Sequence, residues 1–274
     1  TSGVITDPTS EALIVEMDGR QPVMLFNYAC HGVVMGGDNL SLSADWIGAA
    51  KAVIESSGKI GTAMFLQGCC GNINPRWRGS FDEVKHAGES VALPLLEALP
   101  GKPIDAPRIK VAWAEVDLPF MPLPPAEELE QEVTFRRTEL KKAEAEGAPV
   151  VNLQIHRAML GYATDALEMI NSDGGPKSVR VGLQAISLGG LTLATLPGEA
   201  FCEYGLAFRK MTTDEVMPVG YANGNIGYIP TAEAYNEGGY EVNDAIRYYA
   251  VKMIGPESEQ IILDAMKRLL AEVE

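Results

Sequence analysis

Residues 179–199, VRVGLQAISLGGLTLATLPGE, carry the clearest structural signal in the chain. Two apolar stretches, Val179–Leu188 and Leu191–Leu196, flank Gly189-Gly190, and a glycine pair between two such stretches is typical of a tight β-hairpin turn. The second stretch runs into Pro197-Gly198-Glu199. We therefore expect two antiparallel strands here, with a carboxylate at the end of the second strand.

The flanking sequence mixes strand and helix patterns. Short apolar or alternating runs predict further strands at Ala12–Glu16, Val23–Tyr28, Thr62–Gln67, Ile109–Leu118 and Val216–Ala222. Longer periodic runs predict helices from Ser43 or Asp45 to about Ser56, at Phe81–Leu99, Glu127–Glu146 and Ile155–Ile170, after Glu199 to about Met211, and at Glu257–Glu274. A Gly- and Tyr-rich loop is expected from Asn223 to Glu241. Together these elements predict an α/β or α+β fold with mixed, largely antiparallel sheets flanked by helices.

The composition limits the kinds of partner. The chain has 274 residues, 46% of them hydrophobic, and a formal net charge of -15. Phosphate binding needs a basic face, so nucleic acid is not an expected partner. One basic cluster is interleaved with glutamates and is interpreted as a solvated helix face: Arg136, Arg137, Lys141 and Lys142. No apolar run is long enough for a transmembrane helix, and the cellular compartment stays open.

The four cysteines show no metal-binding spacing. They are Cys30, Cys69, Cys70 and Cys202, and no C-x-x-C pair occurs, so a structural zinc knuckle is not predicted. Because Cys69 and Cys70 are adjacent, a disulfide between them would be strained. We interpret all four as small buried hydrophobic residues.

Three polar, Gly-rich turns follow predicted buried strands, at His31, at Gly68–Arg76 and at Glu199. Such turns suit active sites, because the strand supplies rigidity and the loop supplies exposed functional groups. A neutral imidazole at His31 suits a borderline metal such as zinc. His86 and His156 lie within predicted helices and are interpreted as surface or packing residues.

Several of these residues have a second interpretation. Glu199 on its own is consistent with a first-turn glutamate stabilised by the helix dipole. Tyr228 and Tyr240, in the Gly-rich loop, are consistent with packing residues whose hydroxyl groups are solvated. The chain opens with Thr1 and no Met. Thr1 is either an ordinary terminal residue or a nucleophile freed by proteolysis, with its own amine as the base.

Four sequence blocks, taken together in their order and intervals, resemble the neutral/alkaline ceramidase family and look closest to its bacterial ceramidase-like hydrolases. The blocks are NYACH at 27–31, FLQG at 65–68 with GNINP at 71–75, LPGE at 196–199, and YIPT at 228–231 with Glu233, Tyr235, Tyr240 and Glu241. The resemblance extends from about Ala12 to Glu241. It implies that residues 1–274 form a portion of one ceramidase-like catalytic domain that acts on a small-molecule amide.

The resemblance also implies a metal site. In that family a zinc ion is held by two histidines, a glutamate and a tyrosine, and the matching positions here are His31, Glu199 and Tyr228. A second tyrosine, twelve positions after the ligand tyrosine, assists the amide carbonyl, and Tyr240 stands at that interval. The implied activity is hydrolysis of an amide (N-acyl) bond by metal-activated water.

Two departures from the family pattern modify this expectation. The family's other zinc histidine lies in a Thr-His-Thr-His-Ser-type segment upstream, and none precedes His31 here. Either a second chain supplies that histidine, with this chain as a processed half, or the metal site is incomplete. Ceramidases also use a serine in a Gly-Asp-x-Ser-Pro turn, where this chain has Asn74. A serine mechanism at this position is therefore excluded, and ceramide itself is a doubtful substrate.

The remaining expectations concern substrate contacts and competing functions. Backbone N–H groups near Gly71 and the Asn74 amide are expected to form an oxyanion pocket. Arg76 either holds a substrate carboxylate or pairs with a surface acid. Two other hypotheses stay open: an N-terminal-nucleophile hydrolase that uses Thr1, and a ceramidase-like domain that binds a ligand or partner without catalysis.

Overall fold

The computed structural model describes residues 5–37, 39–104, 108–172, 174–249 and 252–274. The chain divides into two compact units. The first unit contains Thr1–Ala114, Gly182–Asn225 and Leu263–Glu274, and the second contains Glu115–Val181 and Ile226–Ile262. Helices and mixed sheets with antiparallel strands confirm the predicted α+β fold. The assignment of residues 1–274 to one catalytic domain stays a prediction.

The first sheet supplies the strand that leads to His31. It contains β1 (Glu11–Val15), β2 (Val23–Tyr28) and β3 (Thr62–Gln67) in that order. β1 pairs with β2 antiparallel, and β2 pairs with β3 parallel. A parallel pair needs a crossover connection, and α1 (Asp45–Ser56) lies in that connection. The predicted strands at 23–28 and 62–67 are confirmed to the residue.

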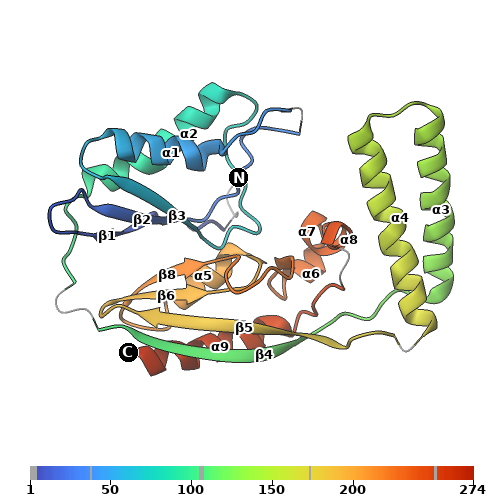
Figure 1. Ribbon diagram of the computed structural model, residues 1–274. Coiled ribbons are helices and arrows are strands. Elements are labelled where there is room, and N and C mark those ends of the chain that lie inside the picture. The colour runs from blue at the N-terminus through green and yellow to red at the C-terminus, as the bar shows by residue number, and fades with distance from the viewer. Residues whose placement is uncertain (1–4, 38, 105–107, 173, 250–251) are drawn as a thin grey trace. The chain divides into compact units, whose positions relative to one another are not determined.

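Two helices, α1 and α2 (Phe81–Glu97), cover one face of this sheet (Figure 1). The core between helices and sheet is built around aromatic rings: the ring centroid of Phe65 lies 5.1 Å from Phe26 and 5.2 Å from Trp46. α2 begins with a capping box, in which the side chains of Ser80 and Glu83 each bond the other residue's backbone N–H. β2 is buried or half-buried along its whole length, as predicted, whereas β3 was predicted to be buried and has only Ala63 buried, with Met64 51% exposed.

The second sheet contains the hairpin that marked the fold in the sequence. Its strand order is β4-β5-β6-β8, with bounds β4 Lys110–Pro119, β5 Ser178–Ser187, β6 Leu191–Thr195 and β8 Glu215–Val219. β5 and β6 pair antiparallel, which confirms the hairpin, and β6 pairs parallel with β8. The connection from β6 to β8 holds β7 (Glu199–Ala200) and α5 (Cys202–Phe208). β4, β5 and α9 (Ser258–Val273) continue from one unit into the other.

Hydrogen bonds join the two sheets at the ends of β2, β3 and β8. The buried Asn27 side chain donates to Leu66 O of β3 in its own sheet and to Pro218 O of β8 in the other sheet, at 2.9 Å each. The Gly220 N–H donates to Gln67 O at 2.9 Å. These bonds bring the carboxyl ends of three strands together, so the turns that follow them share one region of the first unit.

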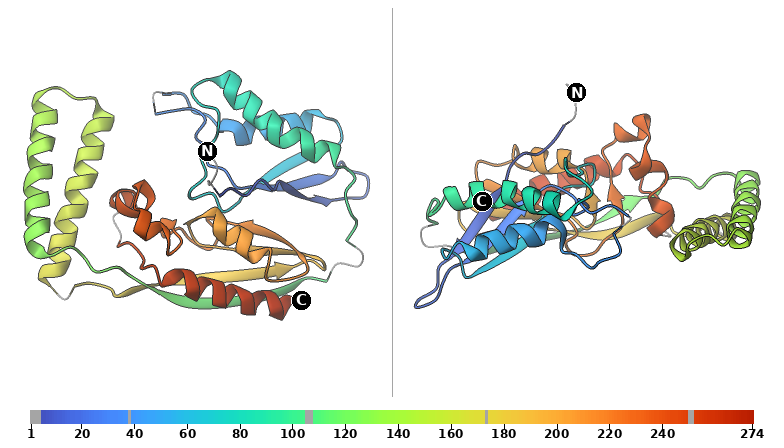
Figure 2. Two further views of the ribbon diagram at one scale, coloured as in Figure 1. Left: turned by 180° about the vertical axis from the view of Figure 1, so that it is seen from behind. Right: turned by 90° about the horizontal axis from the view of Figure 1, so that it is seen from above.

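The second unit is dominated by a helical hairpin, α3 (Ala126–Ala145) and α4 (Val150–Asn171), whose helices lie side by side in Figure 2. The predicted loop at 223–241 and its continuation hold short elements instead: β9 (Tyr228–Ile229), α6 (Ala234–Glu237), α7 (Tyr240–Asn243) and α8 (Ile246–Tyr249). Arg247 of α8 bonds Glu132 of α3, and its guanidinium lies 6.0 Å from the ring centre of Tyr162 in α4. These contacts hold α8 against the hairpin.

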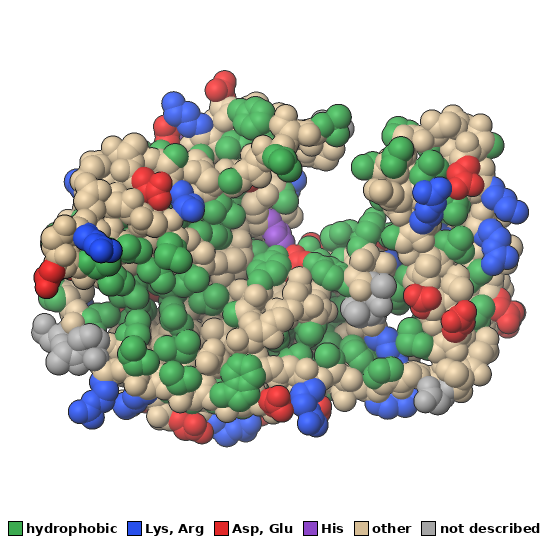
Figure 3. Space-filling view, in the orientation of Figure 1, with side chains coloured by type: hydrophobic (Ala, Val, Ile, Leu, Met, Phe, Trp, Pro, Cys, Tyr) green, Lys and Arg blue, Asp and Glu red, His purple; other side chains and the backbone are tan. Residues whose placement is uncertain are grey.

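The charges on the helical hairpin are mixed. Its visible face carries basic and acidic side chains together (Figure 3). Arg137, Lys141 and Lys142 are exposed, as predicted, whereas Arg136 is half-buried and pairs with Glu132 at 3.3 Å. None of the helices in the described part of the chain combines the length and apolar composition needed to span a bilayer.

The start of α1 differs from the prediction. The N-cap residue is Ala44, which makes no side-chain cap, rather than Ser43 or Asp45. The Asp45 carboxylate instead accepts the N–H groups of Val34 (3.1 Å) and Met35 (2.9 Å), with its own backbone at φ 51°. Buried N–H groups in a loop need acceptors. The Asp45 carboxylate serves as that acceptor instead of capping the helix.

Candidate functional site

The backbone of His31 is held from two sides, where β2 runs into its loop. The His31 N–H donates to Ile73 O at 3.0 Å, and the Trp46 indole N–H donates to His31 O at 2.9 Å. The Gln67 side chain donates to Cys30 O at 3.1 Å, which ties β3 to the residue before the histidine. His31 therefore stands on a rigid support supplied by β3, α1 and the loop that follows β3.

The loop at Gly68–Arg76 packs directly against β7 because residue 71 has no side chain. A Cβ atom at Gly71 would lie 2.3 Å from Glu199 O, so only glycine permits this approach. The Gly71 N–H donates to Ala200 O at 2.8 Å. This particular N–H is therefore engaged within the protein, and the predicted oxyanion pocket would have to use other donors.

His31 and Glu199, predicted from separate turns, lie together in the first unit. His31 Nε2 is 3.6 Å from Glu199 Oε2, and the two side chains are 13% and 7% exposed. The same nitrogen lies 3.3 Å from Gly71 O. An imidazole and a carboxylate from two distant chain segments thus lie side by side, with little solvent around them.

Two further side chains extend this pair. Cys70 Sγ lies 3.6 Å from His31 Nδ1 and 3.9 Å from the Tyr221 hydroxyl, which donates to Glu199 Oε2 at 2.9 Å. Burial raises the pKa of Cys70 to about 12. Burial, with Cys70 and Glu199 nearby, also raises the pKa of Tyr221 well above its usual value. Both groups therefore keep their protons at neutral pH.

Tyr221 was missed by the sequence analysis. The predicted strand at 216–222 ends early, at Val219, and Tyr221 adopts φ 54°, which side-chain-bearing residues rarely do. Backbone strain of this kind is found where surrounding contacts enforce it, and here the Tyr221 N–H donates to Gly198 O at 3.1 Å. The available signal was the Gly-Tyr-Ala-Asn-Gly run after an apolar strand, the same strand-to-turn pattern that marked the other site residues.

The four cysteines are free and buried, which confirms their interpretation as small core residues. Burial raises the pKa of Cys30 and Cys202 to about 12 and that of Cys69 further. None is a thiolate at neutral pH. Cys202 packs beside the loop that carries Asn72, whose side-chain oxygen accepts the Cys202 N–H at 2.9 Å and so fastens the loop to the start of α5.

Tyr228 and Tyr240 belong to the second unit, where the structure brings them together. Their ring centroids lie 6.2 Å apart in an edge-to-face arrangement, and Tyr240 is half exposed. The Tyr249 ring packs edge-on against Tyr228, with centroids 6.5 Å apart, and the tilted Tyr248 ring packs against Tyr240 at 6.4 Å. The interval of twelve residues thus corresponds to a real contact between the two rings, and their roles as ligand and carbonyl donor stay predictions.

The other predicted site residues differ in their surroundings. Asn74 and Arg76 are both exposed. Both interpretations of Arg76, as a substrate contact and as a partner of a surface acid, stay predictions. Thr1 lies outside the described residues. His86 packs edge-on against Trp77 with ring centroids 4.5 Å apart, which agrees with its interpretation as a packing residue.

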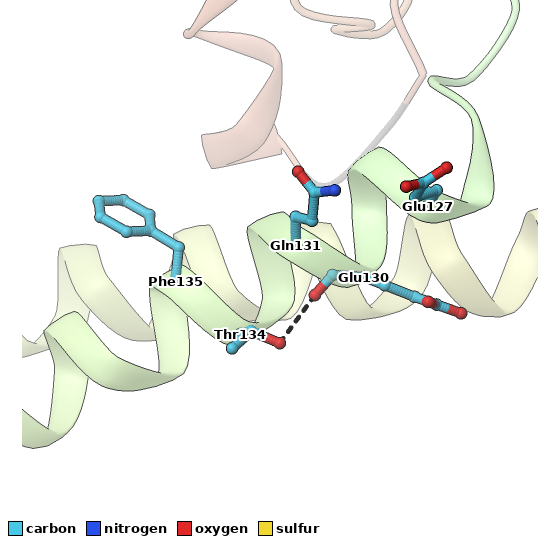
Figure 4. A pocket seen from close by; sticks show the side chains of 5 residues that line it. All are labelled: Glu127, Glu130, Gln131, Thr134 and Phe135. Atoms are coloured by element: carbon cyan, nitrogen blue, oxygen red, sulfur yellow. Dashed lines mark hydrogen bonds between the residues drawn. The ribbon is translucent and has the colours of Figure 1, made fainter.

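A surface pocket in the second unit offers no comparable chemistry. It is lined by one face of α3, with side chains spaced one helical turn apart (Figure 4): Glu127, Glu130, Gln131, Thr134 and Phe135. The Thr134 hydroxyl bonds the Glu130 carbonyl of its own helix at 2.9 Å. The lining holds no histidine or cysteine, so we place the candidate site at His31 and Glu199.

Comparison with solved structures identifies the fold. The crystal structure of neutral ceramidase from Pseudomonas aeruginosa aligns with 97% of this chain at a TM-score of 0.63 and 18% identity. A ceramidase complexed with C2 aligns with 98% of it at a TM-score of 0.62 and 17% identity. The fold is ceramidase-like. The chain spans about half the length of these structures, 47% and 49% respectively. No protein-family model and no curated protein sequence matches it.

Proposed function

We propose that this chain carries part of the active site of a zinc-dependent hydrolase that cleaves an amide (N-acyl) bond in a small molecule. The observation that supports the proposal most strongly is the His31–Glu199 pair, at 3.6 Å between Nε2 and Oε2. The ceramidase-like fold supports it as well, because the sequence blocks that resemble ceramidases include both residues.

The spacing of the pair suits zinc. Two ligand atoms of a tetrahedral zinc ion, each at about 2.0–2.1 Å from the metal, lie roughly 3.3 Å apart. The separation of Nε2 and Oε2 is close to that value. Nitrogen and carboxylate oxygen are also the donor types that zinc accepts in catalytic sites. Within the described residues, no three His, Cys, Asp or Glu side chains form a metal-binding group, so further ligands are needed.

The resemblance supplies candidates for those ligands. Tyr228 is proposed as a third ligand, and a histidine from a second chain as the fourth. When bound, zinc supplies the Lewis acidity that makes water an effective nucleophile at neutral pH. Tyr240 is proposed to donate to the amide oxygen as negative charge develops, an interaction worth about 3 kcal/mol for one well-placed donor.

The chain's own residues orient the pair and shape the substrate site. The Tyr221 hydroxyl fixes one oxygen of Glu199, and Trp46 fixes the backbone of His31. Low exposure of the pair excludes water around it, which strengthens its electrostatic interactions. Asn74 and Arg76 are exposed and chemically suited to contact a polar or carboxylate part of the substrate. Asn74 stands where ceramidases have their serine, so a substrate other than ceramide is proposed.

Zinc content tests the proposal directly. We expect purified protein to bind zinc, and His31→Ala and Glu199→Ala to lower its zinc affinity by at least tenfold. His86→Ala and Glu16→Ala are the matched controls, because both side chains are exposed and lie outside the pair. Circular dichroism confirms that all variants are folded. Full zinc binding by both site variants would refute the proposal and favour a ceramidase-like domain with another function.

A further inference from the structure

Cys70 and Tyr221 form a second polar layer behind the His31–Glu199 pair. Cys70 Sγ contacts His31 on the Nδ1 side, at 3.6 Å, whereas Glu199 lies on the Nε2 side. The Tyr221 hydroxyl bridges the two, at 3.9 Å from Sγ and 2.9 Å from Glu199 Oε2. The four side chains therefore make a closed circuit, and the sequence resemblance assigned no role to two of them.

The circuit bears on where the imidazole proton lies. A neutral imidazole that binds a metal through Nε2 must carry its proton on Nδ1. Cys70 Sγ is the acceptor placed for that proton. The thiol can in turn donate to the Tyr221 oxygen, and the Tyr221 hydroxyl donates to Glu199. In this direction each group donates one hydrogen bond to the next group.

The opposite tautomer has competing acceptors. A proton on Nε2 faces Gly71 O at 3.3 Å and Glu199 Oε2 at 3.6 Å, and in that tautomer Nδ1 accepts from the Cys70 thiol. The balance between the two tautomers therefore depends on the group beside Nδ1, and Cys70 Sγ lies there, at 3.6 Å. Removing the sulfur takes away this acceptor on the Nδ1 side and leaves the Gly71 carbonyl and the Glu199 carboxylate, which both favour a proton on Nε2.

We propose that Cys70 and Tyr221 are positioning residues, which hold His31 in the tautomer that presents Nε2 to a metal and hold the Glu199 carboxylate beside it. This inference rests on the proposed zinc function. Outer-layer groups that orient metal-binding histidines and carboxylates are worth about 10–100-fold in metal affinity, so their removal gives a measurable effect.

The first experiment compares two neighbouring cysteines. Cys70→Ala is expected to lower zinc affinity by about 10–100-fold, measured by competition with a chromophoric chelator. Cys69→Ala is the matched control, since Cys69 is the adjacent cysteine and is equally buried, at 2% exposure against 1% for Cys70. Cys70→Ser retains a group that can accept from Nδ1, and it is expected to recover affinity relative to Cys70→Ala.

The second experiment reads the tautomer without metal. Long-range proton–nitrogen NMR spectra report which ring nitrogen of each histidine is protonated, and the chain has only three histidines to assign. The Nδ1-protonated fraction of His31 is expected to fall in Cys70→Ala and to stay at the wild-type value in Cys69→Ala. This readout is independent of activity and of global stability.

The third experiment tests whether the circuit acts as one unit. Tyr221→Phe removes the hydroxyl and keeps the ring, and it is expected to weaken zinc binding within the same 10–100-fold range. In the Cys70→Ala/Tyr221→Phe double variant the losses are expected to be less than additive, because both residues serve one network.

The outcomes separate the two proposals. If wild-type protein binds no zinc, the proposed function fails, and the tautomer comparison still decides the role of Cys70. If wild-type protein binds zinc while Cys70→Ala matches Cys69→Ala in affinity and in His31 tautomer, the positioning role is overturned and the zinc function stands.

Discussion

Substitution of Gly71 by alanine tests the close approach on which the candidate site depends. A Cβ atom at this position would lie 2.3 Å from Glu199 O and 3.0 Å from Glu199 C. Because carbon and oxygen atoms do not approach closer than about 3.0 Å, the loop and β7 must separate by roughly 0.7 Å. That movement would stretch the Gly71 N–H to Ala200 O bond, now 2.8 Å, beyond hydrogen-bonding range.

The expected loss of stability follows from these two effects. Forcing an extra carbon into a packed site costs about 1–3 kcal/mol, and losing a backbone hydrogen bond about 1 kcal/mol. We therefore expect Gly71→Ala to lower the free energy of unfolding by about 2–4 kcal/mol, and to lower the melting temperature by several degrees. Because the displaced loop carries Ile73, the acceptor of the His31 N–H, zinc affinity should fall as well.

Urea unfolding, followed by circular dichroism and by zinc titration, measures both effects. Gly36→Ala is the matched control, because a Cβ there meets no atom within 4 Å and the backbone needs no glycine-specific conformation. The control is expected to change the free energy of unfolding by less than about 0.5 kcal/mol. If Gly71→Ala unfolds at the same urea concentration as the control, the close packing of the loop on β7 is refuted.

Three further predictions concern other parts of the molecule. Gly161→Ala, within α4 and with open space around the new Cβ, should stabilise the protein by about 0.5–1 kcal/mol in urea unfolding, since alanine loses less entropy in a helix. Asn27→Ala should destabilise it by about 2–4 kcal/mol, because the carbonyls of Leu66 in the same sheet and of Pro218 in the other sheet both lose their donor; an unchanged unfolding midpoint would contradict that role. The raised thiol pKa values predict no labelling by a thiol reagent at pH 8 until denaturant is added. As the unfolded thiols ionise and the folded ones do not, stability should decline above about pH 8.5.

The secondary structure was largely predictable because local patterns specify it. The run Thr62–Gln67 has the length and apolar content of a strand, and β3 has those same bounds. The glycine pair at 189–190 likewise specified a hairpin through turn geometry alone. Prediction was less accurate where tertiary bonds compete with local preference. Asp45 is a residue type that commonly caps helices, but its carboxylate accepts loop N–H groups ten and eleven residues away.

The candidate site was predictable only in its innermost residues, and a physical reason accounts for this limit. A residue that binds a ligand must be rigid and accessible, so it tends to stand where a buried strand ends in a polar turn, and that pattern is visible in the sequence at His31 and Glu199. The groups that orient such residues face no such requirement. Cys70 and Tyr221 meet across 151 residues of sequence, and Cys70 meets His31 across 39. Their partners are set by the packing of Gly71 against β7 and by the turn after β8. Neither feature produces a periodic pattern of apolar residues in the sequence. An outer layer of this kind becomes visible only in the folded structure, and measuring the tautomer of His31 tests its proposed role in this protein.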